Sequence, residues 1–178
     1  MKSKKTFIFF FVAIIIFSGV AIFFAVRYPL LYREEIINYS KTYNLDTALV
    51  ASLINEESSF DKNALSSKGA MGLMQIMPQT ATYVQQLIGE KSECDLYEPK
   101  DNIRIGCYYL NYLYQKFNDQ ILTLCAYNAG ENTVRMWLAN ENYSQDGKTL
   151  NYIPYPQTKA YVDKILYGIR FYKYKLGG

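Results

Sequence analysis

Histidine is absent from the 178 residues of this sequence. Without an imidazole, the chain has no Ser–His or Cys–His pair to activate a nucleophile and no histidine-ligated metal site. Its three cysteines, Cys94, Cys107 and Cys125, are too few for a zinc site of four thiolates. We therefore expect no metal and no cofactor, and any catalysis has to rest mainly on carboxylates or tyrosines.

An excess of charge of one sign is also lacking. The formal net charge of +3 is accounted for by three lysines within the first five residues, Lys2, Lys4 and Lys5. The rest of the chain is balanced, so it lacks the basic surface expected of a nucleic-acid-binding protein. Half of the residues are apolar and 18 are tyrosines, which is enough to build a hydrophobic core and excludes a disordered chain.

One long apolar run is present, residues 7–26, and only Ser18 and Gly19 interrupt it. Twenty helical residues rise by about 30 Å, which is the thickness of the hydrocarbon core of a bilayer. A cleaved signal peptide is the alternative, but its apolar core has roughly 7–15 residues. No Ala-x-Ala site precedes Arg27 either. We favour an uncleaved transmembrane anchor over residues 7–26.

The lysines before this run predict its orientation. Positive charge stays on the cytoplasmic side, so residues 1–6 should be cytoplasmic. Residues 27–178 should then be the extracytoplasmic domain of a single-pass protein of the cell membrane. Arg27 and Arg33, which follow the run, act against this orientation.

An extracytoplasmic domain lies in an oxidising compartment, where disulfides form. Cys94 and Cys107 flank a short loop and the start of a helix, so they are the favoured pair. Cys125 stands among apolar residues in LTLCAYNAG and is expected in the core. Spacing does not fix the pairing, and a fully reduced protein is the alternative.

The chain after residue 27 shows helical periodicity and little strand-like alternation, which predicts one all-α domain. Asp46 is a suitable N-cap, Pro78 suits a first helical turn, and Gly89 suits a helix end. The helices are expected over residues 32–44, 47–57, 78–89, 102–117, 121–130, 131–140 and 158–174. Residues 61–77 (DKNALSSKGAMGLMQIM) read as a loop that is both glycine-punctuated and apolar, which is typical of a groove lining.

Two adjacent glutamates, Glu56 and Glu57, end the second of these helices. Successive helical residues are about 100° apart, which places Glu57 about 10° from the centre of the apolar stripe and Glu56 about 90° from it. A carboxyl on the apolar side, at the negative end of a helix, should have a raised pKa and suit a general acid. The alternative is that Glu57 turns out to solvent where its helix ends. Glu56 is assigned to the solvated face.

Four ordered motifs resemble the signature of lytic transglycosylases of the soluble-lytic-transglycosylase type. The first is ESSFDKNALSSKGAMGLMQIMPQTA, which matches the family pattern E-S-x-F, A-x-S and G-A-x-G-L-M-Q-x-M-P-x-T-A. The others are YEPKDNIRIGCYYLNYL, CAYNAGENTV and IPYPQTKAYVDKIL. Together they cover roughly residues 32–175, and the set of four is far more specific than any one motif.

The resemblance implies a lysozyme-like α-fold that acts on the glycan strands of peptidoglycan. Such enzymes cleave the β-1,4 bond between N-acetylmuramic acid and N-acetylglucosamine and form a 1,6-anhydro product. The glutamate of the E-S pair, here Glu57, is the family's single catalytic acid and base. An ordinary glycosidase needs a second carboxylate instead.

The resemblance also implies roles for further residues. Ser66 and Tyr161 would support the catalytic carboxyl. The other matched positions would line the groove and bind substrate: Gly72, Leu73, Met74, Gln75, Tyr127 and Asn128. Tyr127 as core packing, Ser66 as a turn residue and Gly72 as a residue needed for backbone freedom are the structural alternatives.

One position departs from the family pattern, since Gln157 stands where the fourth motif usually has glutamate. This departure puts the efficiency in doubt more than the type of reaction. Two other functions stay open at this point. One is a goose-type muramidase that uses water, and the other is a catalytically idle module for wall binding or secretion assembly.

Overall fold

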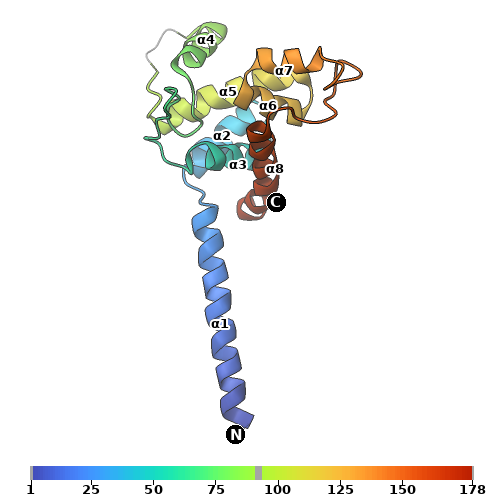
Figure 1. Ribbon diagram of the computed structural model, residues 1–178. Helices are drawn as coiled ribbons and strands as arrows, with labels where there is room; N and C mark the ends of the chain where they lie inside the picture. The colour runs from blue at the N-terminus through green and yellow to red at the C-terminus, as the bar shows by residue number, and fades with distance from the viewer. Residues whose placement is uncertain (1, 91–93, 178) are drawn as a thin grey trace.

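The computed structural model describes residues 2–90 and 94–177, and in this part of the chain the regular secondary structure is all helix, without a strand. Figure 1 shows the predicted all-α architecture, with one helix standing apart from the rest. The helices are α1 (Lys2–Arg27), α2 (Arg33–Thr42), α3 (Thr47–Ser58), α4 (Pro78–Ile88), α5 (Pro99–Phe117), α6 (Gln120–Ala129), α7 (Glu131–Leu138) and α8 (Pro156–Leu176).

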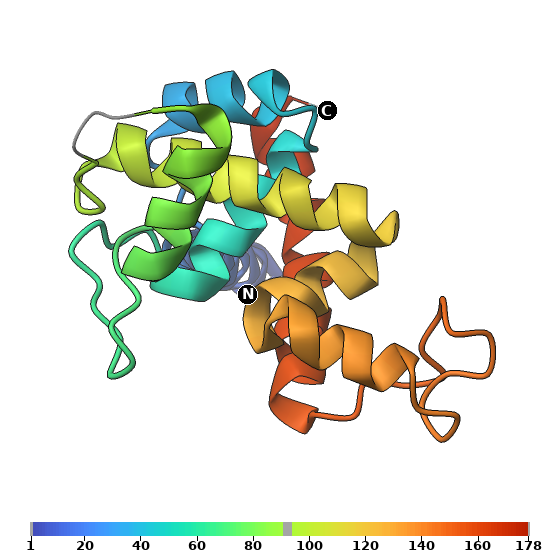
Figure 2. The same cartoon turned by 90° about the horizontal axis from the view of Figure 1, so that it is seen from above.

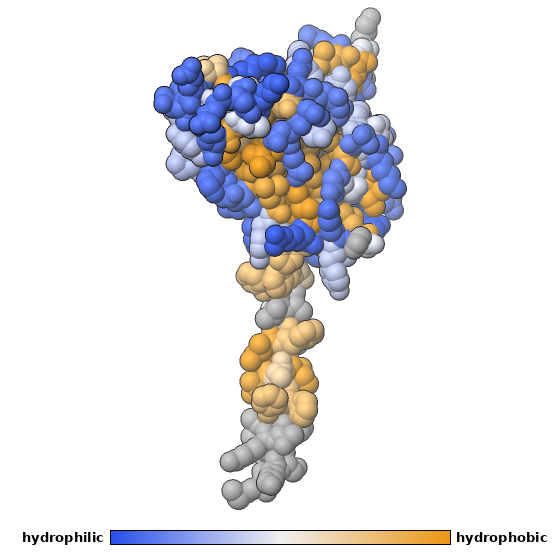
Figure 3. Space-filling model, turned by 90° about the vertical axis from the view of Figure 1, so that its right-hand side faces the viewer, coloured by the Kyte–Doolittle hydropathy of each residue, from blue (hydrophilic) through white to orange (hydrophobic). Residues whose placement is uncertain are grey.

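Helix α1 projects from the folded part as an apolar stalk (Figures 1 and 3). Among the described residues it is the helix long and apolar enough to cross a membrane, over Phe9–Arg27, with a mean hydropathy of 2.9. The predicted apolar run 7–26 lies within it. Met1 and the side chains of residues 2–8, which include the predicted basic N-terminus, lie outside what the structure describes.

Most helix ends follow the local sequence signals. The Asp46 carboxylate accepts hydrogen bonds from the backbone N–H groups of Ala48 and Leu49, as expected of an N-cap. Pro78 begins α4 and Gly89 ends it in the left-handed conformation. Two helices begin earlier than predicted, at Pro99 and Pro156, because proline is favoured in the first helical turn, where its missing N–H needs no partner.

Helices α3 and α8 form the most extensive helix pair of the fold. Seen from above in Figure 2, α8 runs behind the other helices and α3 lies against it. The Ser52 hydroxyl on α3 donates to the Ile165 carbonyl on α8 at 2.7 Å. A Cβ on Gly168 would lie 2.3 Å from the Ser52 Oγ, so glycine permits this close approach.

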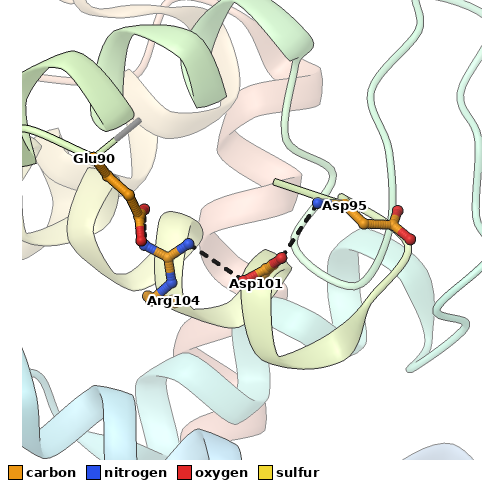
Figure 4. A network of polar contacts seen from close by, with 4 residues as sticks. All are labelled: Glu90, Asp95, Asp101 and Arg104. Carbon is orange, nitrogen blue, oxygen red and sulfur yellow. Dashed lines mark hydrogen bonds and ion pairs between the residues drawn. The ribbon is translucent and has the colours of Figure 1, made fainter. Parts of the chain in front are cut away.

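The connection between α4 and α5 is held by a charged network, shown in Figure 4. The Arg104 guanidinium pairs with Glu90 and, at 3.3 Å, with Asp101. The second carboxylate oxygen of Asp101 accepts from the Asp95 backbone N–H at 3.2 Å. The network therefore joins both ends of this connection to the first turns of α5.

All three cysteines are free thiols in the structure, so the favoured Cys94–Cys107 disulfide is not formed. Cys107 is fully buried on the core side of α5, whereas Cys94 is partly exposed beside Asp95 and Asp101. The position of Cys107 on α5 turns its side chain into the core, away from Cys94, so the two thiols that sequence spacing suggested as a pair do not meet. Cys125 lies in the core, as predicted.

Candidate active site

Glu57 and Tyr161 meet at the contact between α3 and α8. The Tyr161 hydroxyl donates a hydrogen bond of 2.6 Å to the Glu57 Oε1. Tyr161 is buried and Glu57 is partly buried. The other carboxylate oxygen, Oε2, has no hydrogen-bond partner among the described residues, so it is the oxygen that an incoming molecule can approach.

Burial raises the pKa of Glu57 to about 7. The Tyr161 hydrogen bond opposes this shift, and the nearby charge of Glu56 adds to it. The pKa of Tyr161 is held well above its ordinary value by burial and by the Glu57 charge, so this phenol stays protonated and donates. The predicted position of Glu57 on the inner side of its helix is confirmed by its contact with Tyr161, and burial there acts on its pKa in the predicted direction.

Glu56 has a different environment. Its Oε1 lies 2.7 Å from the Lys164 Nζ of α8, and its side chain is 17% exposed. The sequence predicted a solvated position, but α8 covers much of this side chain and supplies a counter-ion. The two adjacent carboxylates thus diverge: Glu57 contacts a neutral phenol, and Glu56 contacts a cation.

The loop of residues 61–77, which we call the loop wall, is fixed by side chains that bind its backbone. The buried amide of Asn102 accepts from the Met74 N–H at 2.7 Å and donates to the carbonyls of Met71 at 2.9 Å and Leu96 at 2.8 Å. Ser58, next to Glu57, donates to the Leu73 carbonyl at 2.8 Å. The sequence identified Asn102 only as part of a motif, and its role as a hub was missed.

The expected groove residues Gly72, Leu73 and Met74 lie in the interior. Leu73 and Met74 have no exposed surface, so their side chains pack in the core and their placement at the groove wall was wrong. Gly72 has a φ of 72°, and an added Cβ would lie 2.2 Å from the Leu96 carbonyl oxygen. Gly106 makes room for the Met74 sulfur in the same way. These glycines let α5 approach the loop wall.

Gln75 and Ser66 both make contacts within the loop wall. The Gln75 Nε2 donates to the carbonyls of Ala64 at 3.2 Å and Gly72 at 3.0 Å, which leaves its carbonyl oxygen to accept from a ligand. The Ser66 Oγ accepts from the Ala70 N–H at 2.9 Å, the geometry of the turn residue that we gave as the alternative.

Tyr127 and Asn128 end α6 beside the loop wall. The Tyr127 hydroxyl donates to the Met74 carbonyl at 2.9 Å, and the Asn128 Oδ1 accepts from the Thr158 hydroxyl of α8 at 2.8 Å. Both residues also border a cavity of about 260 Å³. Its lining is Gln75, Ile76, Met77, Thr80, Tyr109, Tyr127, Asn128, Ala129 and Gly130.

The first turn of α8 also carries the residue that departs from the family pattern. Gln157 is exposed and makes no hydrogen bond to Glu57 within the described part of the chain. Larger hollows occur elsewhere, as between α5, α7 and the following loop, lined by residues such as Lys116, Arg135 and Lys148. The described residues contain no group of three or more Cys, Asp or Glu side chains placed to hold a metal ion.

Comparison with known proteins places this geometry in a family. Residues 34–151 match the transglycosylase SLT domain. The chain is 36% identical over 156 residues to the soluble lytic murein transglycosylase of Escherichia coli K12, which covers 85% of this chain and 24% of that protein. It therefore spans about a quarter of that relative's length.

A second relative is matched over about three quarters of its own length. The membrane-bound lytic murein transglycosylase E of Buchnera aphidicola (subspecies Baizongia pistaciae) is 35% identical over 158 residues, covering 75% of this chain and 74% of that protein. Among solved structures, the lytic transglycosylase Slt of Pseudomonas aeruginosa superposes with a TM-score of 0.77 and 30% identity, covering 86% of this chain and 26% of that one. The helical fold is the lysozyme-like fold of these proteins, and the chain belongs to the transglycosylase SLT domain family.

Proposed function

We propose that this protein is a peptidoglycan lytic transglycosylase with Glu57 as its single acid and base. It would cleave the β-1,4 bond between N-acetylmuramic acid and N-acetylglucosamine and leave a 1,6-anhydro-muramic acid end. The observation that carries the proposal is the partly buried Glu57 carboxyl, which has a pKa of about 7 and accepts a hydrogen bond from Tyr161. A carboxyl with this pKa holds a proton near neutral pH and can also release it.

The reaction uses this carboxyl twice. Protonated Glu57 donates its proton to the glycosidic oxygen as the bond from that oxygen to the muramyl C1 breaks, which leaves an oxocarbenium-like centre. The Tyr161 hydroxyl stabilises the carboxylate formed in this step, since a hydrogen bond to a charged acceptor is stronger than one to a neutral acceptor. The carboxylate then takes the proton of the C6 hydroxyl while the C6 oxygen bonds to C1, and Glu57 is protonated again.

The setting of Glu56 supports a mechanism with one carboxylate. A hydrolytic glycosidase places a second carboxylate about 5–9.5 Å from the acid, where it attacks the sugar or activates water. Glu56 is the carboxylate whose charge acts on Glu57, but it faces Lys164 at 2.7 Å. With its oxygen paired to a cation, Glu56 is a poor base, so the nucleophile is assigned to the substrate's own hydroxyl.

Substrate positioning is assigned to the residues around the small cavity. The Gln75 carbonyl oxygen can accept from an acetamido N–H, and Tyr127 and Asn128 present ring and amide surfaces suited to a sugar. Ser66 is proposed to act near the reacting sugar by fixing the turn of the loop wall with its hydrogen bond to the Ala70 N–H. Gly72, Leu73 and Met74 act through the position of the loop wall.

The same proposal includes the placement of the enzyme. Residues 7–26 would span the cell membrane once, with residues 1–6 in the cytoplasm and the catalytic domain, residues 27–178, outside, where peptidoglycan lies. The apolar stalk α1 supports the membrane span. So do relatives named membrane-bound lytic murein transglycosylases E and C.

Product analysis tests the proposal. Full-length protein in detergent is incubated with purified peptidoglycan, and the soluble fragments are identified by mass spectrometry. We expect 1,6-anhydro-muramic acid ends from the wild type and from Glu56→Gln, and none from Glu57→Gln. Reducing muramic acid ends would instead show hydrolysis, and an absence of fragments from the wild type would show a catalytically idle module.

A further inference from the structure

The last turn of α1 packs against the C-terminal part of α8. The Phe24 ring of α1 stacks on Phe171 with centroids 5.0 Å apart, and Tyr28 stacks on the same ring at 4.3 Å. Tyr167 adds an edge contact to Phe171 at 5.3 Å. Figure 1 shows this end of α8 next to the point where α1 meets the folded part.

The chain leaving α1 is also tied to the domain through its backbone. The carbonyls of three successive residues accept hydrogen bonds from side chains of the folded part. Asn55 donates to Arg27 at 3.3 Å, Lys175 donates to Tyr28, and Tyr172 donates to Pro29 at 2.9 Å. The junction is therefore a fixed joint and not a flexible linker.

The exposed face of α8 beside this joint is aromatic and basic. Tyr167 is 54% exposed and Tyr174 is 85% exposed, and the exposed Arg170 lies between them on the same side of the helix. Arg27, Arg33, Lys173 and Lys175 add positive charge around the joint. Asp46 is the acid that contacts this end of α8, at 3.6 Å from Lys173, and the first turn of α2 after the joint carries Glu34 and Glu35. Basic residues outnumber acidic ones.

The depth of this face follows from its contact with the stalk. Phe24 belongs to the candidate membrane span Phe9–Arg27, three residues before its end, which corresponds to about 4.5 Å of helix rise. Whatever packs on Phe24 therefore lies at the outer boundary of the same bilayer. Tyrosine is enriched at that level of a bilayer. Basic side chains are attracted to it where the leaflet contains anionic headgroups.

We propose that the C-terminal turns of α8, residues 167–175, form a second membrane contact that lies among the lipid headgroups. This inference rests on the proposed anchoring by α1 and not on the catalytic reaction. The partner is a lipid surface that contains anionic headgroups. Because Asn55 precedes Glu57 by two residues, the joint also fixes the height and rotation of the catalytic carboxyl relative to the membrane.

A fluorescent label reports this contact in the full chain. Cys94→Ser removes the partly exposed thiol, while Cys107 and Cys125 stay buried. Tyr174→Cys then carries an environment-sensitive dye, in vesicles of equal parts phosphatidylcholine and phosphatidylglycerol. We expect lipids with a nitroxide near the headgroup to quench most of this fluorescence. A dye at Lys148→Cys, on the loop after α7, should keep its signal.

Further variants test the insertion of α1 and the contribution of charge to the contact. A dye at Phe17→Cys, within the span, reports insertion of α1. Arg170→Glu should reduce the quenching at position 174 at least twofold, since each basic residue near an anionic surface changes the attraction by roughly fivefold. Unchanged quenching would overturn the assignment to anionic headgroups, because the joint alone would then hold this face at the membrane. Lys148→Glu is the matched control and should leave the quenching unchanged.

An unquenched dye at position 174 with a quenched dye at position 17 would overturn the second contact and leave the anchor in place. Unquenched dyes at both positions would overturn both. Peptidoglycan cleavage by the same labelled proteins is measured separately, so a failure of the catalytic proposal stays distinguishable.

Discussion

The two sides of the candidate active site are held in different ways. On the loop wall, residues 61–77, uncharged side chains such as Asn102, Ser58 and Tyr127 bind backbone groups. On the opposite side lie the first turns of α8, which we call the helix wall. Here the side chains of α8 contact other side chains and not backbone groups. These pairs are Tyr161 with Glu57, Thr158 with Asn128, and Lys164 with Glu56.

This difference separates two tasks. Hydrogen bonds to backbone fix where a segment lies, and their loss leaves buried polar groups unpaired, which costs stability. Bonds between ionisable side chains set charge and pKa, and their loss changes chemistry. Substitutions on the loop wall should therefore act first on folding, and those in the ionisable pairs of the helix wall should act first on the reaction and its pH dependence.

The largest expected effect belongs to the residue between the two walls. Glu57→Gln removes the proton donor and should lower kcat at least about 1,000-fold, or roughly 4 kcal/mol, because general acid–base catalysis is lost in both steps. Glu56→Gln is the matched control and should stay within about fivefold, since Glu56 donates no proton and its ion pair with the exposed Lys164 contributes about 1 kcal/mol. Initial rates of peptidoglycan solubilisation measure both.

The same substitution should make the protein more stable. The folded-state pKa of Glu57 is raised to about 7 from 4.5, so the charged form destabilises the fold. This penalty is absent below pH 4.5, grows as the pH rises, and is complete above pH 7, where it reaches about 3 kcal/mol. Denaturant unfolding of Glu57→Gln should show that gain above pH 7 and none below 4.5. A gain at low pH would contradict it.

Asn102→Ala should have the next largest effect, on stability. It leaves the Met74 N–H and two carbonyls unpaired in the core, which should cost about 3 kcal/mol. Asn111→Ala on the same helix removes only a surface contact with Gln115 and should cost less than about 0.5 kcal/mol. Urea unfolding of both variants decides whether Asn102 is the hub of the loop wall.

Tyr161→Phe should act on the reaction. Without the phenol, the carboxylate of Glu57 loses its donor, so kcat should fall about 10- to 100-fold, or roughly 2 kcal/mol. The Tyr161 hydrogen bond lowers the pKa of Glu57, so its removal should raise that pKa. The alkaline limb of the pH–rate profile should then shift to higher pH. A loss of rate with an unmoved profile would assign Tyr161 a purely structural role.

Thr158→Val should have the smallest effect. It removes the hydroxyl that binds the Asn128 Oδ1 but keeps the shape of the buried side chain. We expect a stability loss of about 1 kcal/mol and an unchanged pH–rate profile. A shifted profile would show that this pair, too, reaches the chemistry of Glu57.

The sequence predicted features that depend on one helix at a time. Asp46 as a cap, Pro78 as a helix start and Glu57 on the buried side all follow from local spacing, because side-chain direction within a helix is fixed by its period. The family motifs added Tyr161, which the fold brings to Glu57 from 104 residues away.

Features that depend on two packed elements could not be predicted. Lys164 reaches Glu56 across 108 residues, and Asn102 reaches Met74 across 28. Leu73 and Met74 belong to the core because α5 covers the loop at Gly106, which spacing along the loop does not reveal. The available signal for this contact was the pair Asn102 and Gly106, which lie four residues apart and therefore on one face of α5.

The pKa of Glu57 tests the central claim most directly. Carbon-13 NMR of the glutamate carboxyl groups, in the full-length protein in detergent, follows each titration, and Glu57→Gln identifies the signal of Glu57. The account predicts a midpoint near pH 7. A midpoint near the ordinary value of 4.5 would contradict it, because Glu57 would then carry no proton to donate at neutral pH.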